Sequence, residues 1–114
     1  MELSISIDSP SAMDDAALLQ KFIAKQNLDG IAELELERSV HGPGQQGLGQ
    51  FLGTLLINIS DNLNVVKVLL TQLNIFANKY DRTLRLGNMV IPTHKLTGEQ
   101  IENIAIEAIK NGKV

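Results

Sequence analysis

The residues best placed to do chemistry form the segment GPGQQG at 42–47, which reads G-x-G-x-x-G between an expected strand and an expected helix. In dinucleotide-binding folds such glycines let the backbone approach a pyrophosphate at a helix N-terminus. Here Pro43 removes one backbone N–H, and no second strand ends in an acid that could hold a ribose. Gly42, Pro43, Gly44 and Gly47 are explained more simply as a structural loop. The loop Gly42–Gly49 remains the alternative site for a small ligand or nucleotide.

Other catalytic patterns are weak. The two histidines, His41 and His94, show no ligand spacing with another metal-binding residue. The absence of cysteine excludes disulfides and thiolate chemistry. No serine stands on a Gly-x-Ser-x-Gly elbow, and no carboxylate pair is isolated in an apolar setting. We therefore predict a non-enzymatic protein with no catalytic residues, no metal site and no cofactor.

Composition describes an ordinary globular domain. The 114 residues are 44% hydrophobic and 20% charged, with a formal net charge of −3, which predicts a single domain over 1–114. No Lys/Arg run provides the electrostatic footprint of a nucleic-acid binder. The N-terminal residues carry no secretory signal pattern, which favours a cytoplasmic protein. Polar residues interrupt the longest apolar run, so no stable membrane span is expected.

Local patterns predict most of the elements. Residues 3–7 alternate as a strand, and a helix with an N-cap at Ser11 should end near Asn27. The segment IAELELER at 31–38 alternates as a second strand. Gly87-Asn88 predicts a two-residue hairpin turn that places Leu84, Leu86, Met89 and Ile91 on one face. Thr97 and Gln100 predict a capping box for a last helix with Gly112 at its C-terminal end.

The central region 47–79 is the long apolar part of the chain, and it keeps one helical phase from Leu48 to Ala77. An unbroken helix of thirty residues would be about 45 Å long, whereas a domain of this size has a radius of gyration of about 13 Å. Ser60-Asp61-Asn62 resembles a helix cap. We therefore predict two helices, over 47–59 and 62–79, with a kink or a loop near Asp61.

These elements predict an α+β two-layer sandwich in the order β-α-β-α-(α)-β-β-α, with a small mixed sheet and helices on one face. The other face would expose Glu33, Glu35 and Glu37, which Arg85 could neutralise. Val65, Val68 and Ile75 form a second apolar stripe on the later central helix. The acidic face and this stripe are the two possible interaction surfaces.

The order of elements resembles the type-one effector-associated constant component family of bacterial conflict systems. The resemblance rests on the strand LSISID, the acid-rich helix DDAALLQKFI, the segment LELERSVHGPGQQGLG, the apolar central region, the strand pair TLRL and MVIP, and the terminal amphipathic helix. Gly44-Gln45-Gln46-Gly47 stands where members carry a Pro-Gly-x-x-Gly turn. Two features differ from many members: Ser60-Asp61-Asn62 replaces a Gly-rich connection, and Phe76 stands near the position of a frequent Trp.

The resemblance implies an accessory protein without catalytic residues. Members are associated with caspase-like or trypsin-like peptidase effectors and with signalling proteins in bacterial immunity. A module of this kind would couple an effector to a sensor or restrain it through protein–protein contacts, and could also form a homo-oligomer.

Overall fold

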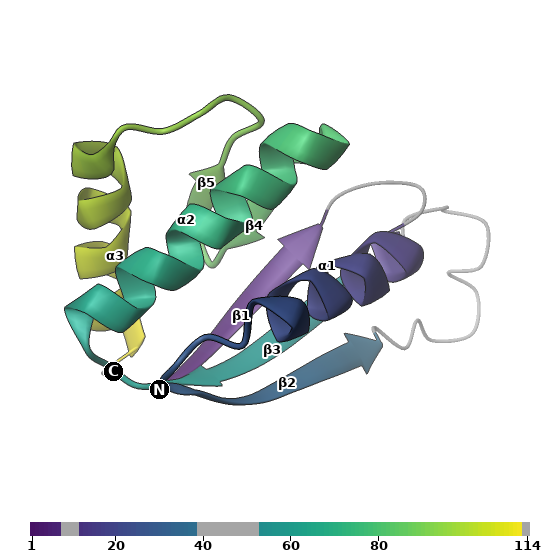
Figure 1. The fold of residues 1–114 in the computed structure, drawn as a ribbon, viewed down its shortest axis with the longest axis horizontal. Coiled ribbons are helices and arrows are strands. Elements are labelled where there is room, and N and C mark those ends of the chain that lie inside the picture. Colours follow the sequence, from purple (N-terminus) through teal and green to yellow (C-terminus); the bar gives the residue numbers. More distant parts are fainter. Residues whose placement is uncertain (8–11, 39–52, 113–114) are drawn as a thin grey trace.

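The computed structural model describes residues 1–7, 12–38 and 53–112. These residues form five strands and three helices (Figure 1): β1 Glu2–Ile7, α1 Ala12–Gln26, β2 Ile31–Arg38, β3 Gly53–Ile59, α2 Leu63–Tyr80, β4 Leu84–Leu86, β5 Met89–Ile91 and α3 Gly98–Gly112. The α+β two-layer class predicted from the sequence is confirmed. The predicted order of elements is wrong at one place, because β3 replaces the first central helix. Ser11, the predicted N-cap of α1, lies outside the described residues.

The first central helix is a strand over Gly53–Ile59. Leu55, Ile57 and Ile59 are buried, while the residues between them are half-buried, which is the two-residue period of a sheet. A short apolar run can fit both the helical period and the two-residue period of a strand, so residue type decides between a helix and a strand. The β-branched residues in this run favour a strand. The prediction of a helix over 47–59 is therefore wrong for 53–59, and 47–52 lie outside the described part of the chain.

The sheet has the order β2-β3-β1-β4-β5, and each pairing between its neighbouring strands is antiparallel. The prediction of a mixed sheet is therefore wrong. Because β3 is antiparallel to both β1 and β2, those two strands run parallel to each other with β3 inserted between them. The helix α1 makes the crossover from β1 to β2, as in a split βαβ unit. The strand β1 therefore lies in the middle of the sheet.

The hairpin of β4 and β5 has the predicted register. Leu84 pairs with Ile91 and Leu86 with Met89, and Gly87 takes the positive φ of 62° that its turn position requires. Arg85 and Val90 occupy the other face, where both are exposed. This local prediction is confirmed because turn chemistry and hydrophobic alternation specify the same register.

Capping residues define the ends of the later helices. The predicted break at Ser60–Asn62 is a connection from β3 to α2, and Asn62 caps α2 by accepting from the N–H groups of Asn64 and Val65. In α3 the predicted capping box is present: the Thr97 N–H donates to Gln100 Oε1 at 2.9 Å, and the Gln100 N–H donates to Thr97 Oγ1 at 3.2 Å. These reciprocal bonds satisfy backbone donors that the first helical turn leaves unpaired.

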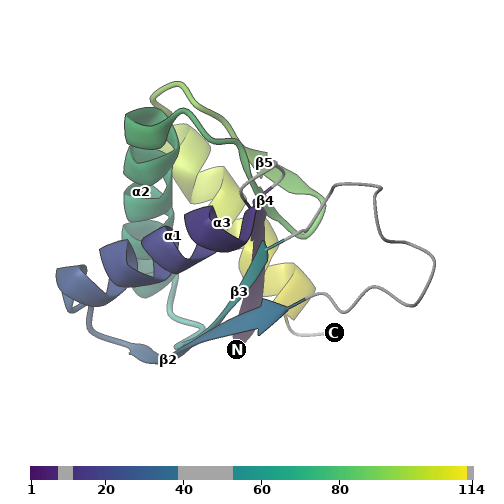
Figure 2. The ribbon, with the colours of Figure 1, turned by 90° about the vertical axis from the view of Figure 1, so that its right-hand side faces the viewer.

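One core cluster joins the inward face of the sheet to all three helices. The helices α1 and α2 lie over the same side of the sheet in both views (Figures 1 and 2). Between them the fully buried Phe76 ring contacts Phe22 edge-on, at 5.6 Å between ring centroids, and Tyr80 at 4.7 Å. Helix α3 contributes Ile101, Ala105 and Ala108 to the same core.

Candidate functional site

Of the predicted acidic surface the structure describes the side chain of Glu35, which is exposed. On β2 the three glutamates are in register with β3 as follows: Glu33 with Asn58, Glu35 with Leu56, and Glu37 with Thr54. Arg85 on β4 pairs with Ser6 on β1, so β1 and β3 separate it from β2. Neighbouring strands lie about 4.8 Å apart, which puts Arg85 about 14 Å from this row. Arg85 is therefore not a cross-strand neighbour of the glutamates, and its neutralisation of them stays a prediction.

The predicted apolar stripe on α2 divides into two parts. Val65 is half-buried against the core, and a Cβ added to Gly30 would meet its Cγ1 atom at 2.8 Å. Val68 and Ile75 instead leave 47% and 45% of their surface exposed. They are seven positions apart, so they lie on one side of the helix. Val65 therefore acts as a packing residue, and Val68 with Ile75 forms what we call the α2 aliphatic pair.

The loop Gly42–Gly49, with Gly42, Pro43, Gly44 and Gly47, lies outside the described residues, as does His41. His94 is exposed in the connection between β5 and α3. No group of three or more His, Cys, Asp or Glu side chains suited to a metal ion occurs within 1–7, 12–38 and 53–112. In those same ranges, no helix has the length and apolar character needed to cross a membrane.

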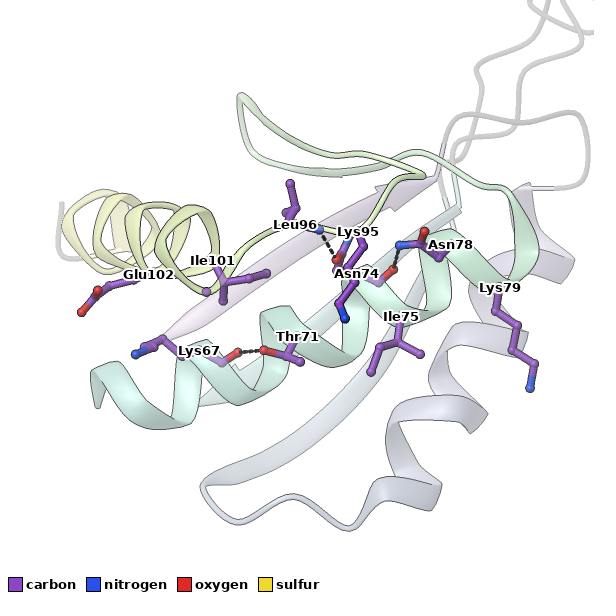
Figure 3. A pocket seen from close by; sticks show the side chains of 11 residues that line it. Lys67, Thr71, Asn74, Ile75, Asn78, Lys79, Lys95, Leu96, Ile101 and Glu102 are labelled. Atoms are coloured by element: carbon purple, nitrogen blue, oxygen red, sulfur yellow. Dashed lines mark hydrogen bonds between the residues drawn. The ribbon is translucent and has the colours of Figure 1, made fainter.

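A cleft of about 920 Å³ lies between α2, α3 and the connection that leads into α3 (Figure 3). We call it the α2–α3 cleft. It is lined by Lys67, Thr71, Asn74, Ile75, Asn78 and Lys79 of α2, by Lys95 and Leu96 of the connection, and by Gly98, Ile101 and Glu102 of α3. Its volume is within the range of about 300–1,000 Å³ found for ligand sites. Ile75 belongs both to the cleft and to the α2 aliphatic pair.

Asn74 holds the connecting segment against α2. Its side chain is only 4% exposed, and its Nδ2 donates to the carbonyls of Pro92 at 3.3 Å and His94 at 3.0 Å. The Leu96 N–H donates to Asn74 Oδ1 at 2.9 Å (Figure 3). A buried amide is stable in a core when its polar atoms find such partners. Asn74 thereby sets the position of one wall of the cleft.

A second set of hydrogen bonds belongs to the α2 wall itself. The Thr71 hydroxyl donates to the carbonyl of Lys67 at 2.8 Å, and Asn78 Nδ2 donates to the carbonyl of Asn74 at 2.8 Å. Both are bonds to the carbonyl four residues earlier, so these polar side chains return to their own helix. The Lys79 ammonium lies over the Tyr80 ring, 5.5 Å from its centroid, and its side chain points away from the cleft in Figure 3. The groups left to meet a bound molecule are the Lys67 and Lys95 ammonium groups, the Glu102 carboxylate and the aliphatic side chains.

The charge of the cleft differs from that of the whole chain. Three lysines, Lys67, Lys79 and Lys95, and one acid, Glu102, line it, whereas the chain carries a net charge of −3. Ile75, Leu96 and Ile101 add an apolar part. Ammonium groups around aliphatic side chains can bind a carboxylate-bearing molecule that also has an apolar portion.

Sequence reasoning did not find this cleft or the role of Asn74. One signal was available: Asn74 lies at a core-facing position of α2, between the buried residues Leu73 and Ala77. A polar residue within an apolar helical face indicates either a buried hydrogen-bonding role or an end of the buried region. Its partners are 18 to 22 positions further along the chain, so the pattern did not identify them.

Comparisons with protein-family models, curated proteins and solved structures find no match for this chain.

Proposed function

We propose that this chain is a non-enzymatic interaction module that binds a protein partner through α2. The observation that carries the proposal is the exposed α2 aliphatic pair, Val68 and Ile75, of which Ile75 also lines the α2–α3 cleft. Two adjoining features, an exposed aliphatic stripe and a concave surface, are typical of a partner site rather than of scattered surface residues. The cleft lining offers binding groups and no nucleophile paired with a base among the described residues.

The family resemblance suggests the biological setting of this proposal. In that setting the module acts in the cytoplasm of a bacterium, as an accessory component of a conflict system. Its partner would be a caspase-like or trypsin-like peptidase effector, or a signalling protein, which the module couples to a sensor or restrains. If the protein forms a homo-oligomer, we expect the same α2 surface to make the contact between its copies.

Affinity capture from the organism that encodes the chain tests this proposal. The test variant replaces both members of the α2 aliphatic pair, V68D with I75D. The control is V90D, because Val90 is 48% exposed on β5, at the far side of the sheet. We expect the wild type and V90D to retain a peptidase or signalling protein in near-equal amount, and the double variant to lose it. Capture of no partner, or equal loss in V90D, would contradict the proposal.

A further inference from the structure

We infer that the α2–α3 cleft recognises an acidic, aliphatic-anchored segment of the partner protein. This inference rests on the proposed function and specifies the chemistry of the recognised segment. Carboxylates of the segment would meet Lys67 and Lys95, and one aliphatic side chain would enter the cleft toward Ile101. The cleft is a separate feature from the acidic face of the sheet, which lies on β2.

Charge complementarity is the first argument for an acidic occupant. The cleft lining carries the ammonium groups of Lys67 and Lys95 against the single carboxylate of Glu102, and Lys79 lies at its edge with its ammonium over the Tyr80 ring. The chain as a whole has a net charge of −3. A local positive region on a negative protein raises the association rate of acidic segments and disfavours basic ones. Lysine also provides a flexible point charge, which suits carboxylates presented in more than one geometry.

The length of the α2 wall sets the length of the segment. The α2 residues that line the cleft run from Lys67 to Lys79, twelve positions that correspond to about 18 Å along the helix axis. A bound helix of about 12 residues would cover this distance, and so would an extended strand of about 5 or 6 residues. Figure 3 shows Thr71 and Ile75 between these two lysines on α2. The occupant should therefore place its aliphatic centre near Ile75 and its acids near Lys67 and Lys95.

The hydrogen bonds of Asn74 make the cleft suitable for such a segment before binding. Three bonds, of 2.9 to 3.3 Å, hold the Pro92–Leu96 connection against α2. A wall that is already ordered loses less conformational entropy when a ligand binds. Lys95 and Leu96 lie on this wall, so one charge and one apolar contact are positioned in the free protein.

Two other occupants of the same surface are outcomes of the test. A second copy of the chain could present the glutamates of its α3, and this would appear as concentration-dependent self-association. A small free anion could bind the lysines alone, and this would appear as binding of acetate or phosphate without any need for an aliphatic residue. Either result in place of peptide binding would overturn the inference.

The experiment uses selection from a displayed library of random peptides about 12 residues long, the length that matches the α2 wall of the cleft. The purified full chain is the target, at physiological salt so that weak nonspecific attraction is screened. We expect the enriched peptides to carry Asp and Glu around a central Leu or Ile. Enrichment of basic or neutral peptides, or no enrichment, would overturn the inference.

Two triple variants with the same change in net charge locate the binding. The cleft variant is K67E/K79E/K95E, and the control is K21E/K25E/K110E, whose lysines lie on α1 and at the end of α3. We expect Kd for the selected peptides to rise at least about tenfold in the cleft variant and less than about threefold in the control. Equal weakening in both variants would show that only the overall charge matters, which would overturn a specific cleft.

A steric variant gives a test independent of charge. Gly98 lines the cleft, and a Cβ built on it meets no atom within 4 Å, so G98L should fold normally and obstruct the cleft. We expect weaker peptide binding with an unchanged Tm; unchanged binding would count against the cleft. The outcomes also separate the two proposals. Peptide binding without partner capture would contradict the proposed function alone, and partner capture without peptide binding would contradict this inference alone.

Discussion

Replacing Asn74 with alanine should destabilise the fold by about 2–3 kcal/mol. The substitution removes three hydrogen bonds to the segment Pro92–Leu96, each contributing about 1 kcal/mol net. Alanine is the better helix former, by about 0.6 kcal/mol, which offsets part of that loss. For a domain of this size, about 1 kcal/mol corresponds to about 4 °C. The variant should therefore melt about 10 °C below the wild type.

Urea unfolding followed by circular dichroism measures this change, with Asn78→Ala as the matched control. Asn78 is exposed and makes one hydrogen bond to its own helix, so its substitution gains the same helix propensity and should change stability by less than about 0.5 kcal/mol. Hydrogen exchange at the Leu96 amide, which donates to Asn74, should accelerate in Asn74→Ala alone. A loss below about 1 kcal/mol, or equal losses in both variants, would refute the reasoning.

Three further substitutions test other parts of the fold. Gly30→Ala should lower the free energy of unfolding in urea by about 2 kcal/mol, because the position has a φ of 88° and the added Cβ would meet Val65 at 2.8 Å. Adding Val65→Ala should recover the part of this loss that is due to the steric contact, and strictly additive losses in the double variant would contradict that contact. Thr97→Ala should cost about 1 kcal/mol by removing the capping box of α3, which Thr97→Ser should largely preserve. Arg82→Met should cost about 1 kcal/mol by removing the 2.9 Å ion pair with Asp15, and unfolding in high salt should reduce the difference between Arg82→Met and wild type.

The parts of the fold predicted correctly depend on contacts between neighbours in the chain. The β4–β5 turn, the capping box at Thr97 and the helical period of α2 each involve residues a few positions apart, where geometry limits the choices. The strand β3 was missed because Leu55 and Ile59 fit a helical period, while Leu55, Ile57 and Ile59 fit a strand. In a run this short, periodicity alone does not separate the two.

The candidate site was predicted less well, because it depends on contacts between distant segments. The helical phase of Val68 and Ile75 separated them from the main core-facing stripe but left open whether they are buried or meet a partner, and the structure exposes both. The cleft required knowledge of how α3 and its connection pack against α2, and nothing near Asn74 in the sequence names Pro92 or His94 as its partners. The order of strands in the sheet is also set by contacts between distant segments. Because β3 lies between β1 and β2, two strands separate Arg85 on β4 from the glutamates on β2.

The central position of β1 also affects when the domain can fold. Leu3 pairs with Ile57 and Ile5 pairs with Leu86, so β1 is synthesised before both of its neighbours and obtains the second of them, β4, only after most of the described chain has been synthesised. Until then its apolar face, with Leu3, Ile5 and Ile7, lacks the partners that bury it in the finished sheet. Such long-range pairings slow folding and leave nascent chains open to misassociation. The sheet can accordingly be completed only after β4 and β5 have been synthesised, and until then chaperones that bind short apolar strands can act on β1.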